Sequence, residues 1–161
     1  MLKRFNPKTV HAPQGKYSHG VDVPSGTRLL YLAGQVGVMP DGSTAPSDEA
    51  QCDQAWANVK AILAEARLGF ADVVKFNAYV TRADLVPVYR GARDRALGNT
   101  PPPASTLVVV AALASPSWIV EIECVAAKAV PAKTAAAKGG GGKGTAAKAR
   151  SKAAKRKPGK K

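Results

Sequence analysis

The chain has 161 residues and a formal net charge of +13 at pH 7, a length that suits one domain with a real core. Its two cysteines are too few for a disulfide framework and lack the spacing of metal ligands. The longest apolar stretch, LLYLAGQVGVM, is interrupted by Gly34, Gln35 and Gly37 and is too short to cross a bilayer. We therefore expect a cytoplasmic protein with no membrane partner, metal or cofactor.

The positive charge is concentrated at one end of the chain. Residues 1–127 hold 12 Lys and Arg against 11 Asp and Glu, whereas residues 128–161 hold the other 12 basic residues and no acidic one. After about Val130 the sequence is rich in Lys, Ala and Gly and cannot bury enough surface to fold. The prediction is a folded domain over residues 1–129 and a disordered basic tail over 130–161.

Short elements follow one another through the folded part. Two strands flank the sequence PSG at 24–26, which is typical of a hairpin turn. One helix is predicted from its N-cap Ser47 to a stop at Gly69, and a second from Asp84 to Leu97. The segment FADVVKFNAYVTR between the helices predicts a strand. The nearly all-apolar ASTLVVVAAL predicts a strand that is covered on both faces.

The last predicted strand lies in SPSWIVEIECVAA. Because side chains alternate along a strand, Glu121 and Glu123 share one face, and Val120, Ile122 and Cys124 share the other. The two carboxylates indicate either a solvated face or a glutamate that points into a pocket. The order of strands, helix, strand, helix and strands predicts an α+β sandwich with two helices on one sheet face.

Four stretches together carry a family resemblance: HAPQGKYSHGV, AGQVGVMPDG, AQCDQAWANVKAILAEARLGFADVVKFNAYVT and VEIECVA. In this order they resemble the RidA (YjgF) family of enamine/imine deaminases over about residues 5–127. The resemblance implies a chorismate-mutase-like fold with a mixed sheet packed on two helices. It also implies a homotrimer with a ligand cleft at each subunit interface. Members of the best-known type hydrolyse reactive enamines and imines to 2-oxo acids and ammonia.

The resemblance also assigns candidate site residues. Tyr17 matches a family tyrosine that lines the cleft, and Glu123 matches the glutamate that handles water. The family arginine that clamps the substrate carboxylate is absent, because Ala104 in PPAS stands where family deaminases have Pro-Ala-Arg-Ser. No Lys or Arg occurs between Arg95 and Lys128 to replace it.

Other polar residues near these positions are candidates for binding a ligand. Ser105 and Thr106 follow Ala104 and could offer hydroxyl groups. His19 is two residues from Tyr17 and could pair with a carboxylate, although an exposed polar role is the alternative. Tyr79 falls on a predicted core face.

Three functions follow from these residues. The first is a hydrolytic deaminase of reactive enamines and imines with an atypical substrate preference, acting as a homotrimer. The second is a non-catalytic trimer that binds a small ligand. The third is a protein that associates with nucleic acid, since the basic tail would bind polyanions without reading their sequence. A solubilising or incidental extension is the alternative for the tail.

Overall fold

The computed structural model describes residues 1–130, and the predicted tail from residue 131 onward lies outside the described residues. In chain order the elements are β1 (Lys3–Phe5), β2 (Gly20–Asp22), β3 (Thr27–Val36), α1 (Asp48–Glu65), the 3-10 helix η1 (Phe70–Asp72), β4 (Val73–Val80), α2 (Leu85–Leu97), β5 (Ala104–Val109) and β6 (Val120–Ala129). Within residues 1–130, no helix is long and apolar enough to cross a membrane.

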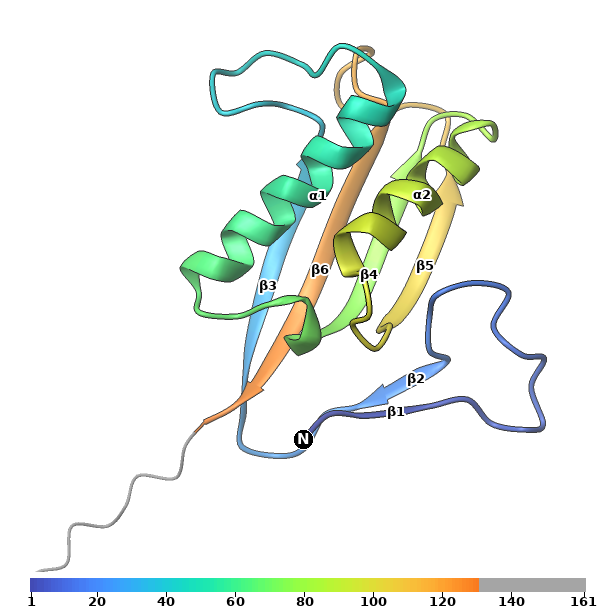
Figure 1. The fold of residues 1–161 in the computed structure, drawn as a ribbon, viewed down its shortest axis with the longest axis vertical. Coiled ribbons are helices and arrows are strands. Elements are labelled where there is room, and N and C mark those ends of the chain that lie inside the picture. The colour runs from blue at the N-terminus through green and yellow to red at the C-terminus, as the bar shows by residue number, and fades with distance from the viewer. Residues whose placement is uncertain (131–161) are drawn as a thin grey trace, which may run out of the picture. The chain divides into compact units, whose positions relative to one another are not determined.

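The main sheet has four strands in the order β3-β6-β4-β5. Strands β4 and β5 are parallel and are connected through α2, and the other neighbours are antiparallel. Helices α1 and α2 lie side by side over one face of this mixed sheet (Figure 1). Within residues 1–130 the opposite face is exposed at Tyr31 and Val108, which are 72% and 42% exposed. This arrangement confirms the predicted α+β sandwich. We call the uncovered side the open face.

The core lies between the helices and the covered face of the sheet. Val120, Ile122 and Cys124 of β6 point into it and are at most 3% exposed. The α1 residue Trp56 packs edge-to-face on Phe76 of β4, with ring centroids 4.8 Å apart. The period-2 pattern predicted for the last strand is therefore confirmed, because alternate residues are buried.

Helix α1 begins as predicted and ends earlier than predicted. The Ser47 hydroxyl accepts a hydrogen bond from the Ala50 N–H at 3.2 Å, which makes Ser47 the N-cap. The helix ends at Glu65, and Arg67 takes the left-handed conformation with φ of 58°. Gly69, the predicted stop, instead precedes η1. The Arg67 N–H donates to the Ala64 carbonyl at 2.9 Å and the Leu68 N–H to the Leu63 carbonyl at 2.8 Å. A Schellman motif with arginine in the left-handed position therefore ends the helix.

The predicted hairpin before residue 36 is wrong. Although a turn containing Gly26 connects β2 to β3, β2 pairs with β1 in a separate two-stranded sheet. Strand β3 instead pairs with β6, from Thr27 opposite Ala129 to Val36 opposite Glu121. The ten residues of β3 find a partner of equal length in β6, whereas β2 has only three residues.

Within one chain, the prediction that both faces of the penultimate strand are covered is also wrong. Strand β5 is at the edge of the main sheet, and α2 covers one of its faces only. Val108 and Val109 are 42% and 48% exposed. The apolar sequence of β5 therefore leaves uncovered hydrophobic surface at this edge.

Candidate functional site

The Glu123 carboxylate lies on the open face and is held by two donors from β4. Its Oε1 accepts hydrogen bonds from Asn77 Nδ2 at 2.8 Å and from the Tyr79 hydroxyl at 3.1 Å. Asn77 lies directly opposite Glu123 in the register of β4 and β6, and Tyr79 lies opposite Glu121. Because both donors use the same oxygen, Oε2 is the carboxylate atom left to meet a ligand.

Tyr79 departs from the core position that the sequence predicted. It shares the open face with Asn77, while its neighbours Ala78 and Val80 are fully buried on the helix side. The hydrogen bond to Glu123 raises the pKa of Tyr79 above its ordinary value, so the phenol remains a proton donor. Tyr79 therefore helps to orient Glu123.

A small hollow opens beside this carboxylate. It has a volume of about 130 Å³ and is lined by residues of three adjacent strands: Tyr31, Leu32, Lys75, Asn77, Glu123, Cys124 and Val125. Lys75 brings a cation into the hollow and donates a hydrogen bond to the Thr106 hydroxyl at 2.5 Å. A carboxylate, an amide, a phenol and an ammonium group therefore lie close together on one sheet face.

Glu121 has a different environment from Glu123. Its carboxyl group lies against the backbone of Gly34, where a Cβ atom would overlap it. Gly34 lies in the irregular stretch where the register between β3 and β6 shifts. The glycine therefore provides the space for the Glu121 side chain, and only Glu123 of the two acids lines the hollow.

Tyr17 and His19 are positioned by Ser18. The Ser18 N–H donates to the carbonyl of Pro103 at 2.8 Å, and Ser18 forms an isolated parallel bridge with Ala104. The flanking rings of Tyr17 and His19 contact edge-to-face, with centroids 5.8 Å apart. Tyr17, His19 and Ala104 therefore form a group at the outer edge of β5.

This group is separated from Glu123 within one chain. From Ser18 through β5 and β4 to β6 there are three strand spacings, or roughly 14 Å. Thr106 pairs with Asn77 and shares the open face, whereas Ser105 pairs with the buried Phe76 and faces the helices. Of the predicted ligand-binding residues, Thr106 is thus the one in contact with the hollow, through Lys75.

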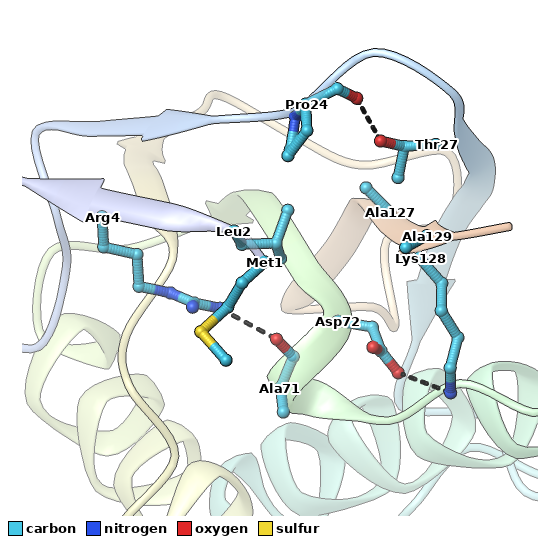
Figure 2. Close-up of a pocket in the computed structure, with 10 residues that line it drawn as sticks. All are labelled: Met1, Leu2, Arg4, Pro24, Thr27, Ala71, Asp72, Ala127, Lys128 and Ala129. Atoms are coloured by element: carbon cyan, nitrogen blue, oxygen red, sulfur yellow. Dashed lines mark hydrogen bonds and ion pairs between the residues drawn. The ribbon is translucent and has the colours of Figure 1, made fainter. Parts of the chain in front are cut away.

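A second hollow of about 190 Å³ lies where the start of the chain meets the end of β6 (Figure 2). An Arg4 guanidinium nitrogen donates to the carbonyl of Ala71 at 2.9 Å. Lys128 and Asp72 form an ion pair at 3.5 Å. None of the predicted site residues lines this hollow. Within residues 1–130, no cluster of three His, Cys, Asp or Glu side chains could hold a metal ion.

Sequence reasoning missed Lys75, Asn77 and Tyr79. They are far from Glu123 along the chain; Asn77, for example, is 46 residues away. The segment VVKFNAYV did contain a signal, because these three residues alternate with Val74, Phe76, Ala78 and Val80 and so had to share one strand face. The sequence did not show that β4 pairs with β6, and it is this pairing that brings these residues to Glu123.

The comparisons with known proteins agree with this architecture. A family model described as Endoribonuclease L-PSP matches residues 8–128. A RutC family protein of Pasteurella multocida is 33% identical over 133 residues, which are 80% of this chain and 100% of that protein. TdcF of Escherichia coli K12, provisionally named a reactive intermediate deaminase, is 34% identical over 68 residues, which are 42% of this chain and 50% of TdcF.

A solved structure extends the similarity to three dimensions. The crystal structure of YyfB from Yersinia pestis, a Rid-family protein of unknown function, superposes with a TM-score of 0.69. The two sequences are 33% identical, and the superposed region covers 78% of this chain and 97% of YyfB. Fold and matches define a Rid-type α+β domain, and the chain belongs to the RidA/YjgF family, as the sequence motifs predicted.

Proposed function

We propose that this protein is a hydrolytic deaminase of reactive enamine and imine intermediates, with Glu123 as the group that activates water. The observation that carries the proposal is the geometry of Glu123. Two donors hold Oε1, which leaves Oε2 for a water molecule in the adjoining hollow. A positioned carboxylate of this kind acts as a general base.

The reaction balances without a cofactor. An enamine tautomerises to a protonated imine, and the oxygen of water adds to the imine carbon as Glu123 takes a proton from that water. Glu123 then passes this proton to the amino nitrogen of the resulting carbinolamine. As the C–N bond breaks and ammonia leaves, the carbinolamine hydroxyl gives its proton to Glu123 and becomes the C=O group. Asn77 and Tyr79 keep Glu123 aimed throughout, since each donates to its Oε1.

The size of the hollow supports a small substrate. The family description refers to an endoribonuclease, whereas TdcF is named for deamination. A volume of about 130 Å³ is well below the 300–1,000 Å³ of pockets for drug-sized ligands. A small imine suits this space better than a ribonucleotide does.

The substrate preference follows from Ala104. A guanidinium at this position would fix a carboxylate through two parallel hydrogen bonds, and a methyl group offers none. We infer that the protein does not depend on such a two-point clamp. Its ranking of imines therefore differs from that of relatives with the arginine.

The proposal includes assembly as a homotrimer. Four large apolar residues are exposed on β3 and β5, namely Leu29, Tyr31, Val108 and Val109. Contact between copies would cover apolar surface of this kind. A neighbouring copy would also bring its Tyr17 to the Glu123 hollow, a distance that one chain does not span.

The test is the release of ammonia and oxo product from imines generated in situ. An amino-acid oxidase supplies carboxylated imines, and an amine oxidase supplies uncharged ones. The native chain should exceed the spontaneous rate, and Glu123→Gln should lower kcat by about 100-fold or more. Glu121→Gln is the matched control, since Glu121 lies against Gly34 instead. Native activity at the spontaneous rate on both substrate classes would refute the enzyme and favour the ligand-binding trimer.

The composition of the tail favours a second role in nucleic-acid association. Residues 128–161 carry 12 basic residues and no acidic one, which would release counterions from DNA or RNA. The full chain should retard DNA in a gel at low salt and lose this effect as salt rises. A chain ending at residue 130 should not retard DNA. Equal retardation by both chains would refute the role of the tail.

A further inference from the structure

Lys75 lies beside the position of the absent arginine. In the register of the main sheet it lies directly opposite Ala104 on β5 and opposite Val125 on β6. Its side chain points to the open face, as those of Asn77 and Tyr79 do. No basic residue occurs in the sequence between Arg95 and Lys128. The parallel pairing of β4 and β5 nevertheless places a basic residue from an earlier strand, Lys75, beside Ala104.

Lys75 and Glu123 line the same hollow. They are diagonal neighbours on adjacent strands, since Glu123 is opposite Asn77, two residues from Lys75. Diagonal Cα atoms on antiparallel strands are about 7–8 Å apart. The hollow that both side chains line has a volume of about 130 Å³, which suits a small molecule whose carboxylate is bonded directly to its reacting carbon.

The ammonium group of Lys75 has capacity to bind an anion. Its Nζ has three donor hydrogens, and the Thr106 hydroxyl accepts one of them. Within residues 1–130, no carboxylate lies within ion-pair distance of this nitrogen. Partial burial lowers the pKa of Lys75 below its ordinary value, so an anion placed here would relieve the cost of an unpaired charge.

We propose that Lys75, steadied by Thr106, binds the carboxylate of a 2-imino acid whose imine carbon faces Glu123, in place of the arginine absent at Ala104. The inference rests on the proposed function. It also refines that function: the substrate is anionic, and one ammonium group holds it instead of a guanidinium fork. A lysine is a point charge on a flexible stem, so it tolerates anions of more than one shape.

The first experiment compares two substrates in two variants. Lys75→Met should raise KM for a carboxylated imine at least about 10-fold. It should change kcat less, and it should leave kcat/KM for an uncharged imine within about 2-fold. Lys75→Arg should restore most of the lost affinity. Lys60→Met is the matched control, because Lys60 is exposed on α1, on the other side of the sheet.

The second experiment does not require turnover. Binding of pyruvate and of its neutral methyl ester is measured by calorimetry on the native chain. Pyruvate should bind more tightly than the ester, and Lys75→Met should remove the difference. Thr106→Val should weaken pyruvate binding less than Lys75→Met does, because only the support of Lys75 is lost. Unchanged thermal unfolding and elution volume show that each variant is folded and assembled.

The outcomes separate the two proposals. If Lys75→Met lowers pyruvate binding and the native chain does not hydrolyse imines, the lysine site stands and the deaminase fails. If hydrolysis depends on Glu123 but Lys75→Met loses no preference for carboxylated substrates, the deaminase stands and the lysine site fails. Equal affinity of the native chain for pyruvate and its ester would also overturn the lysine site.

Discussion

The two faces of the main sheet are made of the same strands, but they differ in how deeply their side chains are buried and in how polar they are. On the helix side, Phe76, Ile122 and Cys124 are at most 3% exposed. On the open face, Asn77 and Glu123 alternate with them and form a polar cluster that is only partly buried. The comparison shows that one face secures the fold, while the other can carry chemistry because little of the core depends on it.

The largest effect should come from the helix side. Ile122→Ala removes a fully buried side chain and should lower the free energy of unfolding by about 2–5 kcal/mol. Its neighbour Glu121, on the open face, gives the matched variant Glu121→Ala, which should cost about 1 kcal/mol or less. Urea unfolding followed by circular dichroism measures both. Equal costs would mean that the two faces contribute alike to stability.

The next effect concerns the apolar edge of the open face. Val108→Asp places a charge on surface that we propose to be covered in the homotrimer, and burial of an unpaired charge is strongly unfavourable. Light scattering after size exclusion should show a trimer for the native chain and a monomer for the variant. Ala57→Asp, on the exposed surface of α1, should remain trimeric. A monomeric native chain would contradict the proposed assembly.

A smaller effect should separate two tyrosines on opposite sides of the sheet. Tyr79→Phe removes a donor to Glu123 and should lower kcat/KM about 5- to 10-fold, the usual effect of losing one hydrogen bond. Tyr89→Phe should leave kcat/KM unchanged and should not destabilise the fold, because the buried Tyr89 hydroxyl has no partner among the described residues. The assay is imine hydrolysis with thermal unfolding in parallel. A loss of activity in Tyr89→Phe would show that the hydroxyl group on the helix side also contributes to hydrolysis.

The smallest effect is expected for alkylation of the two cysteine thiols, which lie on the helix side. Burial raises the pKa values of Cys52 and Cys124 to about 12, so at pH 8 only about one thiol in ten thousand is ionised. Alkylation of the native chain should therefore be negligible at pH 8 and complete after unfolding. Rapid labelling of the folded chain would show that the helix side opens.

The same thiols give a pH dependence with a definite sign. The unfolded chain releases these protons near pH 9.0, whereas the folded chain keeps them up to about pH 12. Between these values the folded state binds more protons, so stability should fall as pH rises. Cys124→Ala should show a smaller decrease over this interval than the native chain, as measured by urea unfolding at several pH values.

Local patterns in the sequence predicted part of this structure. The alternation around Glu123 predicted which side chains of β6 are buried, because a strand has a fixed period. The Ser47 cap predicted the start of α1. Strand partners could not be predicted, since β2 and β3 are adjacent in sequence and belong to different sheets. The exposure of β5 was missed because an apolar sequence does not reveal which of its faces another element covers.

For the candidate site, too, the sequence predicted single positions but not the contacts between strands. Glu123 and Thr106 were proposed from single positions, and both lie on the open face. Lys75 and Tyr79 contact Thr106 and Glu123 on that face only because β4 pairs with both β5 and β6. The contacts that orient Glu123 are therefore a product of sheet topology, which no single segment encodes.

The short bridge between Ser18 and Ala104 has a consequence for how activity is measured. It holds Tyr17 at the edge of β5, three strand spacings from Glu123. If Tyr17 and Glu123 act together as we propose, each chain would carry two half-sites that only assembly joins. Activity per chain should then fall on dilution, as copies separate. A mixture of Tyr17→Phe and Glu123→Gln chains should regain activity that neither variant has alone, because some interfaces would pair an intact half from each.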